Sequence, residues 1–440
     1  MTASTENGSD SVVINPISHL RGELRLPGDK SISHRAAMIA ALARGESTFR
    51  NFSTARDCEA TLACLRSLGV EISKRDSTVV VRGVGITGLQ KPDEVLNAQN
   101  SGTTMRLLAG MLAGQPFSST ITGDESLLKR PMLRVAEPLR LMGATVNLSA
   151  NNSGPLQIVG RHPLQPIDYE PTIASAQLKS AVLLAALAGN TNATVDEPTK
   201  TRDHTERLLQ EFGASVKRDN KRISLQSDEL KKTVDAKIAG DISSAAFVIA
   251  AAIALPGSDL LIRDVGLNPT RTAFVAKLTE LGANIEISEQ RVENSEPVGT
   301  LHVCGVPLKN KLPIVVAAKD VSSLIDELPL LAFLAASIGC SMDLHDAGEL
   351  RVKESDRISA TVDNLTRMGA EIIEREDGWL LEPGSKLRGT QLQSFGDHRI
   401  AMSCAVAALS ADGSSIIEGG RSAVAVSFPE FWELLQSVSE

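Results

Sequence analysis

The chain has 440 residues, of which 42% are hydrophobic and 22% charged, and its formal net charge at pH 7 is −8. This length allows two or more domains with full cores, and the composition is that of an ordinary soluble globular protein. Aromatic residues make up 3% of the chain, which together with the mild acidity argues against nucleic acid as the main partner, and no apolar run reaches the roughly 18 residues that a membrane span requires.

The N-terminal stretch MTASTENGSDS contains neither a basic nor an apolar region, so we expect a short polar tail rather than a signal peptide. Five scattered cysteines show no metal-ligand spacing, and such an odd set is typical of free thiols in a reducing compartment. They are Cys58, Cys64, Cys304, Cys340 and Cys404. We therefore expect a cytoplasmic protein.

Two phrases recur along the chain. The first ends an amphipathic helix with a glycine and then starts a strand, and its copies are LRSLGVEI, LRLMGATV, LQEFGASV, LTELGANI and LTRMGAEI. The second is a small polar patch followed by an Ala/Leu-rich helix, and its copies are SHRAAMIAALA, SGTTMRLLAGMLA, SAQLKSAVLLAALA, SSAAFVIAAAIAL, DELPLLAFLAAS and DHRIAMSCAVAALS. Because the second set has little polar face, we expect these helices to be buried on all sides. The last repeat offers only FPEFWELLQS as its amphipathic helix.

The repeats predict an α/β protein built from six units, and they leave two arrangements open. Six units are compatible with one solenoid or with two globular domains of three units each. The segment 236–243 falls midway along the chain and is the expected boundary in the second arrangement.

Cationic side chains stand at the starts of several expected buried helices, namely Lys30, Arg35, Arg106 and Arg399. Serine and aspartate residues at the same places are explained equally well as N-caps. The cations are not, because they oppose the helix dipole unless an anion is shared. This pattern therefore predicts anion binding at the helix starts.

Of three further charged phrases, two also have a purely structural explanation. KRPM holds Lys129 and Arg130 beside a proline, and LRVKESDRI is compatible with a solvated helical face of paired charges. TKTRDHTERLL reads as a capped helix start with Arg202 and His204 solvated. The sequence has no Walker phosphate loop, no spaced zinc ligands and no nucleophile elbow, and nothing in it requires a cofactor or a metal.

Taken together, these phrases resemble the enolpyruvyl transferase family over nearly the whole chain. The motifs that carry the resemblance are PGDKSISHRA, NSGTTMR, KRPM, SAQLKSA, RDHTE, NPTR, DELP, KESDR and DHRIAM. The family fold is a two-domain inside-out α/β barrel of six βαβαββ repeats, three per domain, with buried helix N-termini facing the interdomain cleft. The resemblance implies one discontinuous domain of residues 1–28 plus 241–440 and a second of residues 29–240, with the active site in the cleft.

The resemblance also implies the reaction. The 5-hydroxyl of shikimate 3-phosphate attacks C2 of phosphoenolpyruvate, C3 gains a proton, and the tetrahedral intermediate loses phosphate, as one step toward chorismate and the aromatic amino acids. No covalent enzyme intermediate, cofactor or metal is implied, so catalysis rests on proton transfer and charge stabilisation. The implied partners are these two small molecules, with no nucleic acid and no membrane, and a monomer is expected.

Site residues are carried over position by position. Shikimate 3-phosphate is bound by Lys30, Ser31, Arg35, Ser175, Ala176, Gln177, Arg202, Asp326 and Lys353. Phosphoenolpyruvate is bound by Lys30, Gly102, Arg130, Gln177, Arg357 and Arg399. Asp326 and Glu354 form the acid/base pair, with either order of steps left open, and Lys30 and His398 assist. Arg106 is expected to support these groups without touching substrate.

Two positions bear on how this chain differs from its relatives. Many relatives carry a lysine two residues before the Phe-Pro near the C-terminus, where this chain has Val426. Some glyphosate-tolerant relatives carry alanine where this chain has Gly102, so we expect glyphosate to inhibit this chain appreciably.

The alternatives are a sister enzyme that acts on UDP-N-acetylglucosamine, a nucleic-acid cyclase of related architecture, or a non-enzymatic repeat scaffold. The sister enzyme usually has a catalytic cysteine where this chain has GDESLLKRPMLR, which contains none.

Overall fold

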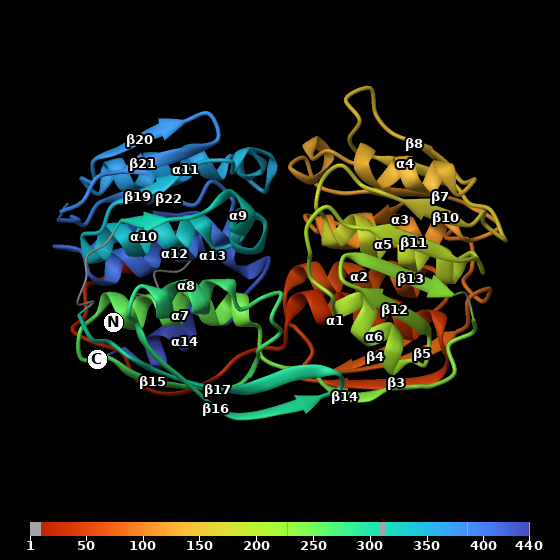
Figure 1. Cartoon of the computed structure of the whole chain (residues 1–440), viewed down its shortest axis with the longest axis horizontal. Helices are drawn as coiled ribbons and strands as arrows, with labels where there is room; N and C mark the ends of the chain where they lie inside the picture. The colour runs from red at the N-terminus through yellow and green to blue at the C-terminus, as the bar shows by residue number, and fades with distance from the viewer. Residues whose placement is uncertain (1–9, 227, 308–312, 385, 440) are drawn as a thin grey trace. The chain divides into compact units, whose positions relative to one another are not determined.

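The computed structural model describes residues 10–226, 228–307, 313–384 and 386–439 (Figure 1). The expected polar tail lies outside these residues, apart from its last two. The chain divides into two compact units. The first comprises Met1–Pro27, Ala239–Arg291 and Pro297–Glu440, and the second comprises Gly28–Ile238 and Val292–Glu296. Each unit has a hydrophobic core of its own.

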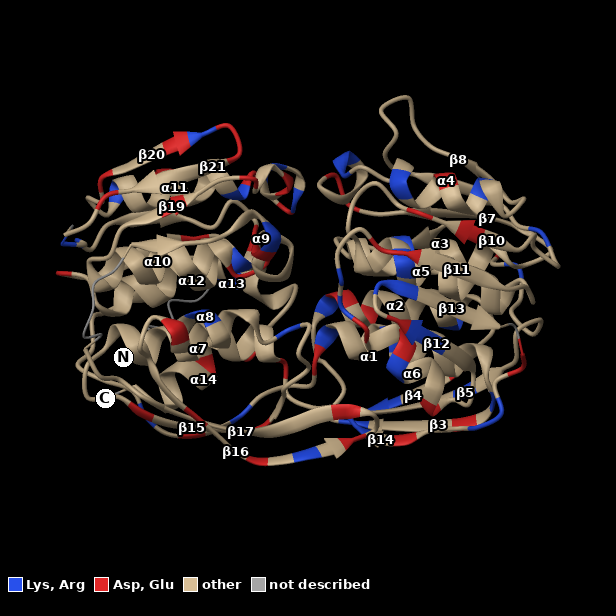
Figure 2. Cartoon of the chain, viewed as in Figure 1, with Lys and Arg blue, Asp and Glu red and all other residues tan. Residues whose placement is uncertain are grey.

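The six Ala/Leu-rich helices form as expected and are buried along almost their whole length. In the second unit they are α1 (Lys30–Leu42), α3 (Gly102–Ala113) and α5 (Ala176–Ala188). In the first unit they are α7 (Ile242–Ala254), α10 (Leu328–Ile338) and α12 (His398–Leu409). Figure 2 draws α10 and α12 almost wholly without charge, as burial on all sides requires.

The amphipathic helices end within the copies of the first phrase, as expected, and the last repeat has a helix at FPEFWELLQS. They are α2 (Arg56–Ser67), α4 (Leu133–Leu141), α6 (His204–Glu211), α8 (Ala273–Glu280), α11 (Arg357–Arg367) and the C-terminal α14 (Phe431–Ser437). The glycine after each of the first five has φ between +83° and +96°, at Gly69, Gly143, Gly213, Gly282 and Gly369. The predicted left-handed C-terminal caps are confirmed, because glycine has no Cβ to clash in this conformation. The remaining short helices are η1 (Leu127–Lys129), α9 (Ala318–Leu324), η2 (Gly348–Val352) and α13 (Gly420–Ala425).

The described strands form six separate sheets, three in each unit. The sheets of the second unit contain β3 (Arg44–Arg50), β4 (Glu71–Arg75), β5 (Thr78–Val84) and β14 (Asp235–Lys237); β6 (Leu96–Asn97), β7 (Ser118–Thr122), β8 (Thr145–Asn147) and β9 (Leu156–Val159); and β10 (Ile167–Tyr169), β11 (Ala193–Asp196), β12 (Ser215–Asp219) and β13 (Arg222–Gln226). Those of the first unit contain β2 (Arg21–Arg25), β15 (Asp259–Gly266), β16 (Asn284–Glu293) and β17 (Glu296–Cys304); β18 (Ile314–Val315), β19 (Met342–Leu344), β20 (Ile372–Arg375) and β21 (Gly378–Leu381); and β1 (Val12–Ile14), β22 (Gln391–Gln393) and β23 (Ser415–Glu418).

One pairing scheme repeats in these sheets. A parallel pair, such as β14 with β3, is extended by antiparallel neighbours, such as β5 and then β4. The sheets that contain β7, β11 and β19 follow the same order. Two N-terminal strands complete sheets of the first unit, because β2 pairs with β15 in parallel and β1 pairs with β23 antiparallel. The predicted α/β class with six repeats is confirmed.

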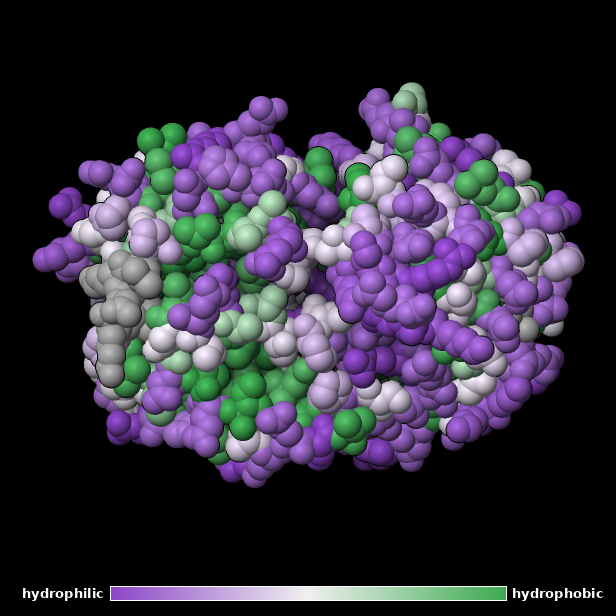
Figure 3. Space-filling model, in the orientation of Figure 1, coloured by the Kyte–Doolittle hydropathy of each residue, from purple (hydrophilic) through white to green (hydrophobic). Residues whose placement is uncertain are grey.

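The surface is consistent with the composition. Hydrophilic residues predominate on the face of the second unit drawn in Figure 3. Among the described residues, no single helix has the length and apolar composition to cross a membrane, and the bent pair α9–α10 meets that test only when its two helices are taken together.

Candidate active site

A buried arginine at the start of α11 holds several carboxylates of the first unit. The side chain of Arg357 is 1% exposed, and its Nε donates to Asp397 Oδ2 at 2.8 Å. Its Nη2 donates to Glu354 Oε2 at 2.6 Å, while its Nη1 lies 3.6 Å from Asp326 Oδ1. One guanidinium therefore brings together Asp326 and Glu354, the two carboxylates that the resemblance implies for proton transfer. The interpretation of KESDR as a solvated helical face is wrong, because Arg357 is buried.

Burial and charge oppose each other at this arginine. Burial disfavours ionisation of Asp397, but the charge of Arg357 outweighs it and holds the pKa of Asp397 below its ordinary value. Burial also disfavours the charged form of Arg357, but Asp397 and Glu354 raise its pKa. Arg357 Nη1 has no hydrogen-bond partner among the described residues. The site thus contains a fixed, fully charged guanidinium with one nitrogen, Nη1, that lies 3.6 Å from Asp326 and makes no hydrogen bond among the described residues.

The second residue of α12, Arg399, links three helix starts in the same unit. Its Nη1 donates to the backbone oxygen of Asp326 at 2.8 Å and to Glu327 Oε1 at 3.2 Å. Its Nη2 donates to Ser243 Oγ, on α7, at 2.9 Å and lies 3.7 Å from Asp326 Oδ2. Asp326 therefore lies between two arginines, and α7, α10 and α12 are joined by this contact set.

Two further predicted residues of the first unit lie close to this cluster in the chain. His398, the first residue of α12, is 4% exposed, and its Nδ1 lies 4.0 Å from Asp397 Oδ1. Lys353 is partly buried and pairs with Glu349 Oε1 at 3.1 Å. His398 thus reaches the Arg357 cluster through Asp397, whereas the described contact of Lys353 is with η2.

In the second unit, the start of α1 carries a lysine that is paired with an aspartate. Lys30 Nζ donates to Asp57 Oδ2, on α2, at 2.9 Å. The helix is capped by Asp29, whose Oδ1 accepts from the backbone N–H of Ile32 at 2.9 Å. The N-cap explanation therefore belongs to Asp29 and not to the serines that follow, and Ser31 is partly exposed beside Lys30.

Arg35 is fixed by hydroxyl and carbonyl oxygens from three helices. It is 3% exposed, and its Nε donates to Thr205 Oγ1, on α6, at 2.7 Å. Its Nη2 donates to Ser180 Oγ, on α5, at 3.0 Å, and its Nη1 donates to the backbone oxygen of Ser31 at 2.8 Å. These three acceptors fix the orientation of the guanidinium at the start of α1.

At the start of α3, Gly102 lies beside two arginines. A Cβ added at this glycine would lie 2.8 Å from Arg106 Nη1 and 3.4 Å from Arg130 Nη1. Arg106 Nη1 donates to Gln177 Oε1 at 2.7 Å, and Arg130 Nη2 donates to Asn100 Oδ1 at 2.7 Å. The structure therefore gathers Gly102, Arg130 and Gln177 in one place, with Arg106 holding the amide of Gln177.

The remaining predicted residues lie at helix starts of the second unit. Ser175 is the N-cap of α5 and accepts from the backbone N–H of Leu178 at 3.3 Å, and Ala176 is the first residue of that helix. Arg202 lies in the loop before α6. The neighbouring His204 is 1% exposed and lies 2.7 Å from Glu296 Oε1, so the expectation that it is solvated is wrong.

Several residues of these groups were missed by the motif reasoning. Asp57, Ser180 and Thr205 hold the predicted cations from other helices, and Ser180 and Thr205 lie inside the SAQLKSA and RDHTE motifs without having been assigned this role. Glu327 belongs to the DELP motif, but its bond to Arg399 was not expected from the sequence. Among the described residues, one group has metal-ligand chemistry, namely Asp259, His302 and Cys304, and it contains none of the predicted site residues.

Each unit thus carries a cluster of polar side chains suited to one chemical role. The first unit places two carboxylates at an arginine, which suits proton transfer beside an anion. The second unit places a lysine, several arginines and a glutamine at helix starts, which suits phosphate and carboxylate groups.

Comparison with solved structures first defines the class. The chain resembles the enolpyruvyl transferase NikO from Streptomyces tendae with a TM-score of 0.76 over 98% of both chains and 16% identity, which shows the fold. It resembles an EPSP synthase from Acinetobacter baumannii with a TM-score of 0.85, 40% identity and 98% coverage of both chains. The predicted enolpyruvyl transferase fold is confirmed, and the single solenoid is wrong.

Comparison of sequences defines the family. The family model for EPSP synthase (3-phosphoshikimate 1-carboxyvinyltransferase) matches residues 14–435. The chain is 46% identical over 429 residues to the 3-phosphoshikimate 1-carboxyvinyltransferase of Desulforamulus reducens, covering 97% of this chain and 99% of that one. It is 45% identical over 426 residues to the enzyme of the same name from Bacillus licheniformis, covering 96% and 98%. The chain belongs to the EPSP synthase family, and the scaffold interpretation is wrong.

Proposed function

We propose that the protein transfers the carboxyvinyl group of phosphoenolpyruvate to the 5-hydroxyl of shikimate 3-phosphate and releases phosphate. The observation that carries this proposal is the pair of carboxylates, Asp326 and Glu354, held at the buried guanidinium of Arg357. Membership of the EPSP synthase family supports the substrates and the place of the reaction in aromatic amino acid synthesis.

The two carboxylates perform the proton transfers. Asp326 takes the proton of the 5-hydroxyl while the hydroxyl oxygen forms its bond to C2 of phosphoenolpyruvate. Glu354 gives a proton to C3. When the C2–O bond to phosphate breaks, Glu354 takes a proton back from C3 and the double bond reforms. Nearby substrate anions favour the protonated form of a carboxylate, which a proton donor requires. His398 assists by orienting neighbouring groups, and Lys30 assists by stabilising negative charge on the substrates.

Phosphoenolpyruvate is held by Lys30, Gly102, Arg130, Gln177, Arg357 and Arg399. Arginine suits this work because its planar fork pairs with carboxylate or phosphate through two parallel hydrogen bonds. The Nη1 group of Arg357, which has no hydrogen-bond partner among the described residues, is the donor available to the substrate. Arg106 acts indirectly, through its bond to Gln177 Oε1.

Shikimate 3-phosphate is held by Lys30, Ser31, Arg35, Ser175, Ala176, Gln177, Arg202, Asp326 and Lys353. The support for this set is its place at the starts of α1, α5, α6, α10 and α11, where backbone N–H groups and cations favour anions.

The setting of the enzyme is part of the proposal. It acts as a cytoplasmic monomer on two small molecules and requires neither cofactor nor metal for this reaction. Glyphosate inhibits it, because Gly102 has no side chain to occupy the space beside Arg130. Val426, which follows α13, stands where many relatives carry a lysine, so the arginines supply the phosphate contacts.

Phosphate release tests the proposal. Purified protein mixed with phosphoenolpyruvate and shikimate 3-phosphate should release one phosphate per product formed, and neither substrate alone should. UDP-N-acetylglucosamine in place of shikimate 3-phosphate should give no release. Release only with the sugar nucleotide would contradict the proposal and favour the sister reaction.

A further inference from the structure

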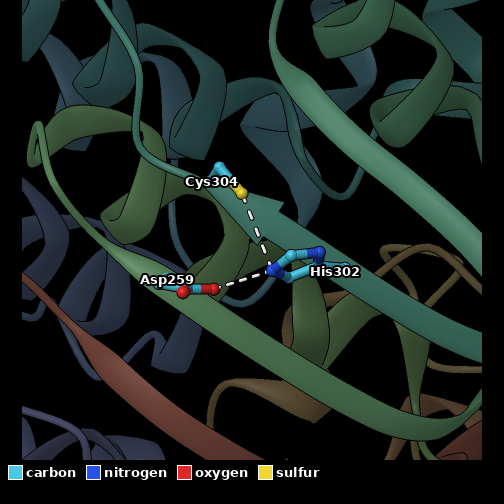
Figure 4. A group of neighbouring side chains, drawn as sticks. All are labelled: Asp259, His302 and Cys304. Atoms are coloured by element: carbon cyan, nitrogen blue, oxygen red, sulfur yellow. Dashed lines mark hydrogen bonds and ion pairs between the residues drawn. The ribbon is translucent and has the colours of Figure 1, made fainter.

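A group of three metal-ligating side chains lies on the β15–β17 pair of the first unit (Figure 4). His302 Nε2 lies 2.7 Å from Asp259 Oδ1 and 3.6 Å from Cys304 Sγ. All three ligand atoms lie within 4.8 Å of one another. None of these residues belongs to the groups that serve the proposed reaction.

Strand register explains why the three side chains meet. His302 and Cys304 are two positions apart on β17, so they project from the same face of the sheet. Asp259, at the start of β15, is the direct antiparallel partner of Cys304. The alternate residues Leu301 and Val303 are fully buried in the core of the unit, so the opposite face, which carries the three ligands, is the outer one. The backbone therefore fixes the placement of all three.

We propose that Asp259, His302 and Cys304 bind a divalent cation of the Zn²⁺ class. A mixed set of carboxylate, imidazole and thiolate ligands is typical of Zn²⁺ and similar metals. Tetrahedral Zn²⁺ with bonds of about 2.0–2.3 Å places its ligand atoms about 3.3–3.7 Å apart. The separation of His302 Nε2 and Cys304 Sγ already fits, and the exposed Asp259 needs to open from its hydrogen bond by less than about 1 Å.

The local charge favours a cation at this place. Asp259 and Glu286 are both negatively charged neighbours of the Cys304 thiol. The same neighbours attract a metal ion, which replaces the thiol proton when it binds. Glu286 lies on β16, the other neighbour of β17 in the sheet.

A second cluster of histidine and aspartate side chains, around His345, provides a comparison for the proposed metal site. His345 Nε2 lies 3.0 Å from Asp343 Oδ1, and its Nδ1 lies 3.9 Å from Asp377 Oδ1. However, the guanidinium of Arg375 bonds to both Asp343 and His345. A fixed cation therefore already occupies the space that a metal would need, which makes His345 a matched control.

The test measures metal binding by the full chain, independently of turnover. Chelator-treated protein is titrated with Zn²⁺ by calorimetry and, separately, with Co²⁺ by absorption, since a cobalt–thiolate bond gives a charge-transfer band that bound imidazole alone does not. We expect one Zn²⁺ per chain and the cobalt–thiolate band. Cys304→Ser should abolish the band and weaken Zn²⁺ binding at least tenfold, His302→Gln should weaken binding at least tenfold, and His345→Gln should change neither.

Absence of stoichiometric Zn²⁺ binding would overturn the proposal, and so would unchanged Zn²⁺ affinity in Cys304→Ser. Both cysteine and histidine variants alter partly exposed side chains on the outer face of the sheet, so they should retain the fold, and circular dichroism checks this. Phosphate release from phosphoenolpyruvate should be the same with and without Zn²⁺. If the wild-type protein releases no phosphate in either condition, the proposed function is contradicted, whereas the metal titration still tests the metal site on its own.

Discussion

At the residue scale, the contacts of Glu354 lead to a prediction about proton transfer. Its Oε2 accepts from Arg357, and its side chain is 22% exposed, so Glu354→Gln should keep the fold while removing an acid/base group. We expect kcat to fall at least 100-fold, since a positioned acid or base contributes about 10²–10⁴ in rate, with the melting temperature nearly unchanged. Glu374→Gln, which also removes a carboxylate paired with an arginine, should retain activity. Glu354→Gln activity within threefold of wild type would contradict the assignment.

The surroundings of Gly102 predict an effect on inhibitor and substrate together. A methyl group there would lie 2.8 Å from Arg106 Nη1, so the flexible end of that arginine must move, and 3.4 Å from Arg130 Nη1. Gly102→Ala should therefore weaken glyphosate inhibition at least tenfold and raise KM for phosphoenolpyruvate several-fold, both measured by phosphate release. Gly348→Ala, whose Cβ would make only an ordinary contact at 3.8 Å, should change neither constant. An unchanged inhibition constant in Gly102→Ala would show that this glycine does not control access.

Single residues also show what the sequence allowed and what it did not. Lys30, Arg35 and Arg399 were identified as unusual because their charge opposes a helix dipole that can be expected from sequence. Their partners Asp57, Thr205 and Ser243 were not, because each comes from a different helix and only tertiary packing brings it close. Motifs therefore predicted the charges of the site, and packing supplies the groups that orient them.

At the element scale, the five glycine caps allow a direct test of backbone conformation. Gly282 has φ +90°, and a Cβ there would have nothing within 4 Å, so Gly282→Ala changes conformational energy without a clash. The left-handed conformation costs a non-glycine residue about 1–2 kcal/mol. The melting temperature of Gly282→Ala should therefore be lower than that of wild type by roughly 2–8 °C in a unit of this size. Gly266→Ala, at a glycine without positive φ and with ordinary contacts at 3.5 Å, should unfold within about 1 °C of wild type. Equal melting temperatures for the two variants would contradict the argument.

A helix or strand could be predicted from the sequence when the residues that specify it lie close together in the chain. Hydrophobic periodicity and terminal glycines predicted the apolar and amphipathic helices, because both signals lie within about a dozen residues. Strand register is not local, and the metal-ligating group shows the consequence. Cys304 shows no metal-ligand spacing to another cysteine, and Asp259 lies 43 residues before His302. Only the pairing of β15 with β17 places them together.

At the scale of the whole molecule, the separate cores of the two units matter for stability. The repeats predicted six units but left their grouping open, because periodicity records each unit and not which units share a core. The cluster of the first unit includes Trp379, and the cluster of the second includes Phe49 and Phe212. Each unit also buries a group with a lowered pKa, His34 in the second unit and Asp397 in the first, so the two units should respond to acid in different pH ranges.

Acid should weaken the second unit first. His34 is buried in that unit, and burial, together with Lys30 and Arg35, lowers its pKa well below the ordinary value. The unfolded chain therefore takes up a proton below pH of about 6.5 that the folded unit refuses, which costs about 1.4 kcal/mol per pH unit until the folded pKa is reached. Asp397, in the first unit, also has a lowered pKa. Because it is an acid, its stabilising effect is complete above pH of about 3.9 and is lost only as the pH falls from there toward the folded pKa.

The two tryptophans make this difference measurable. Trp379 and Trp432 are the only tryptophans of the chain, and both belong to the first unit, so their fluorescence reports that unit while circular dichroism reports both. Between pH 7 and pH 5, the urea midpoint followed by circular dichroism should fall more than the midpoint followed by fluorescence. His34→Gln should remove most of this difference in pH dependence, whatever its stability at pH 7, because glutamine takes up no proton in either state. Equal shifts of the two midpoints, or an unaltered pH dependence in His34→Gln, would show that the acid sensitivity arises elsewhere.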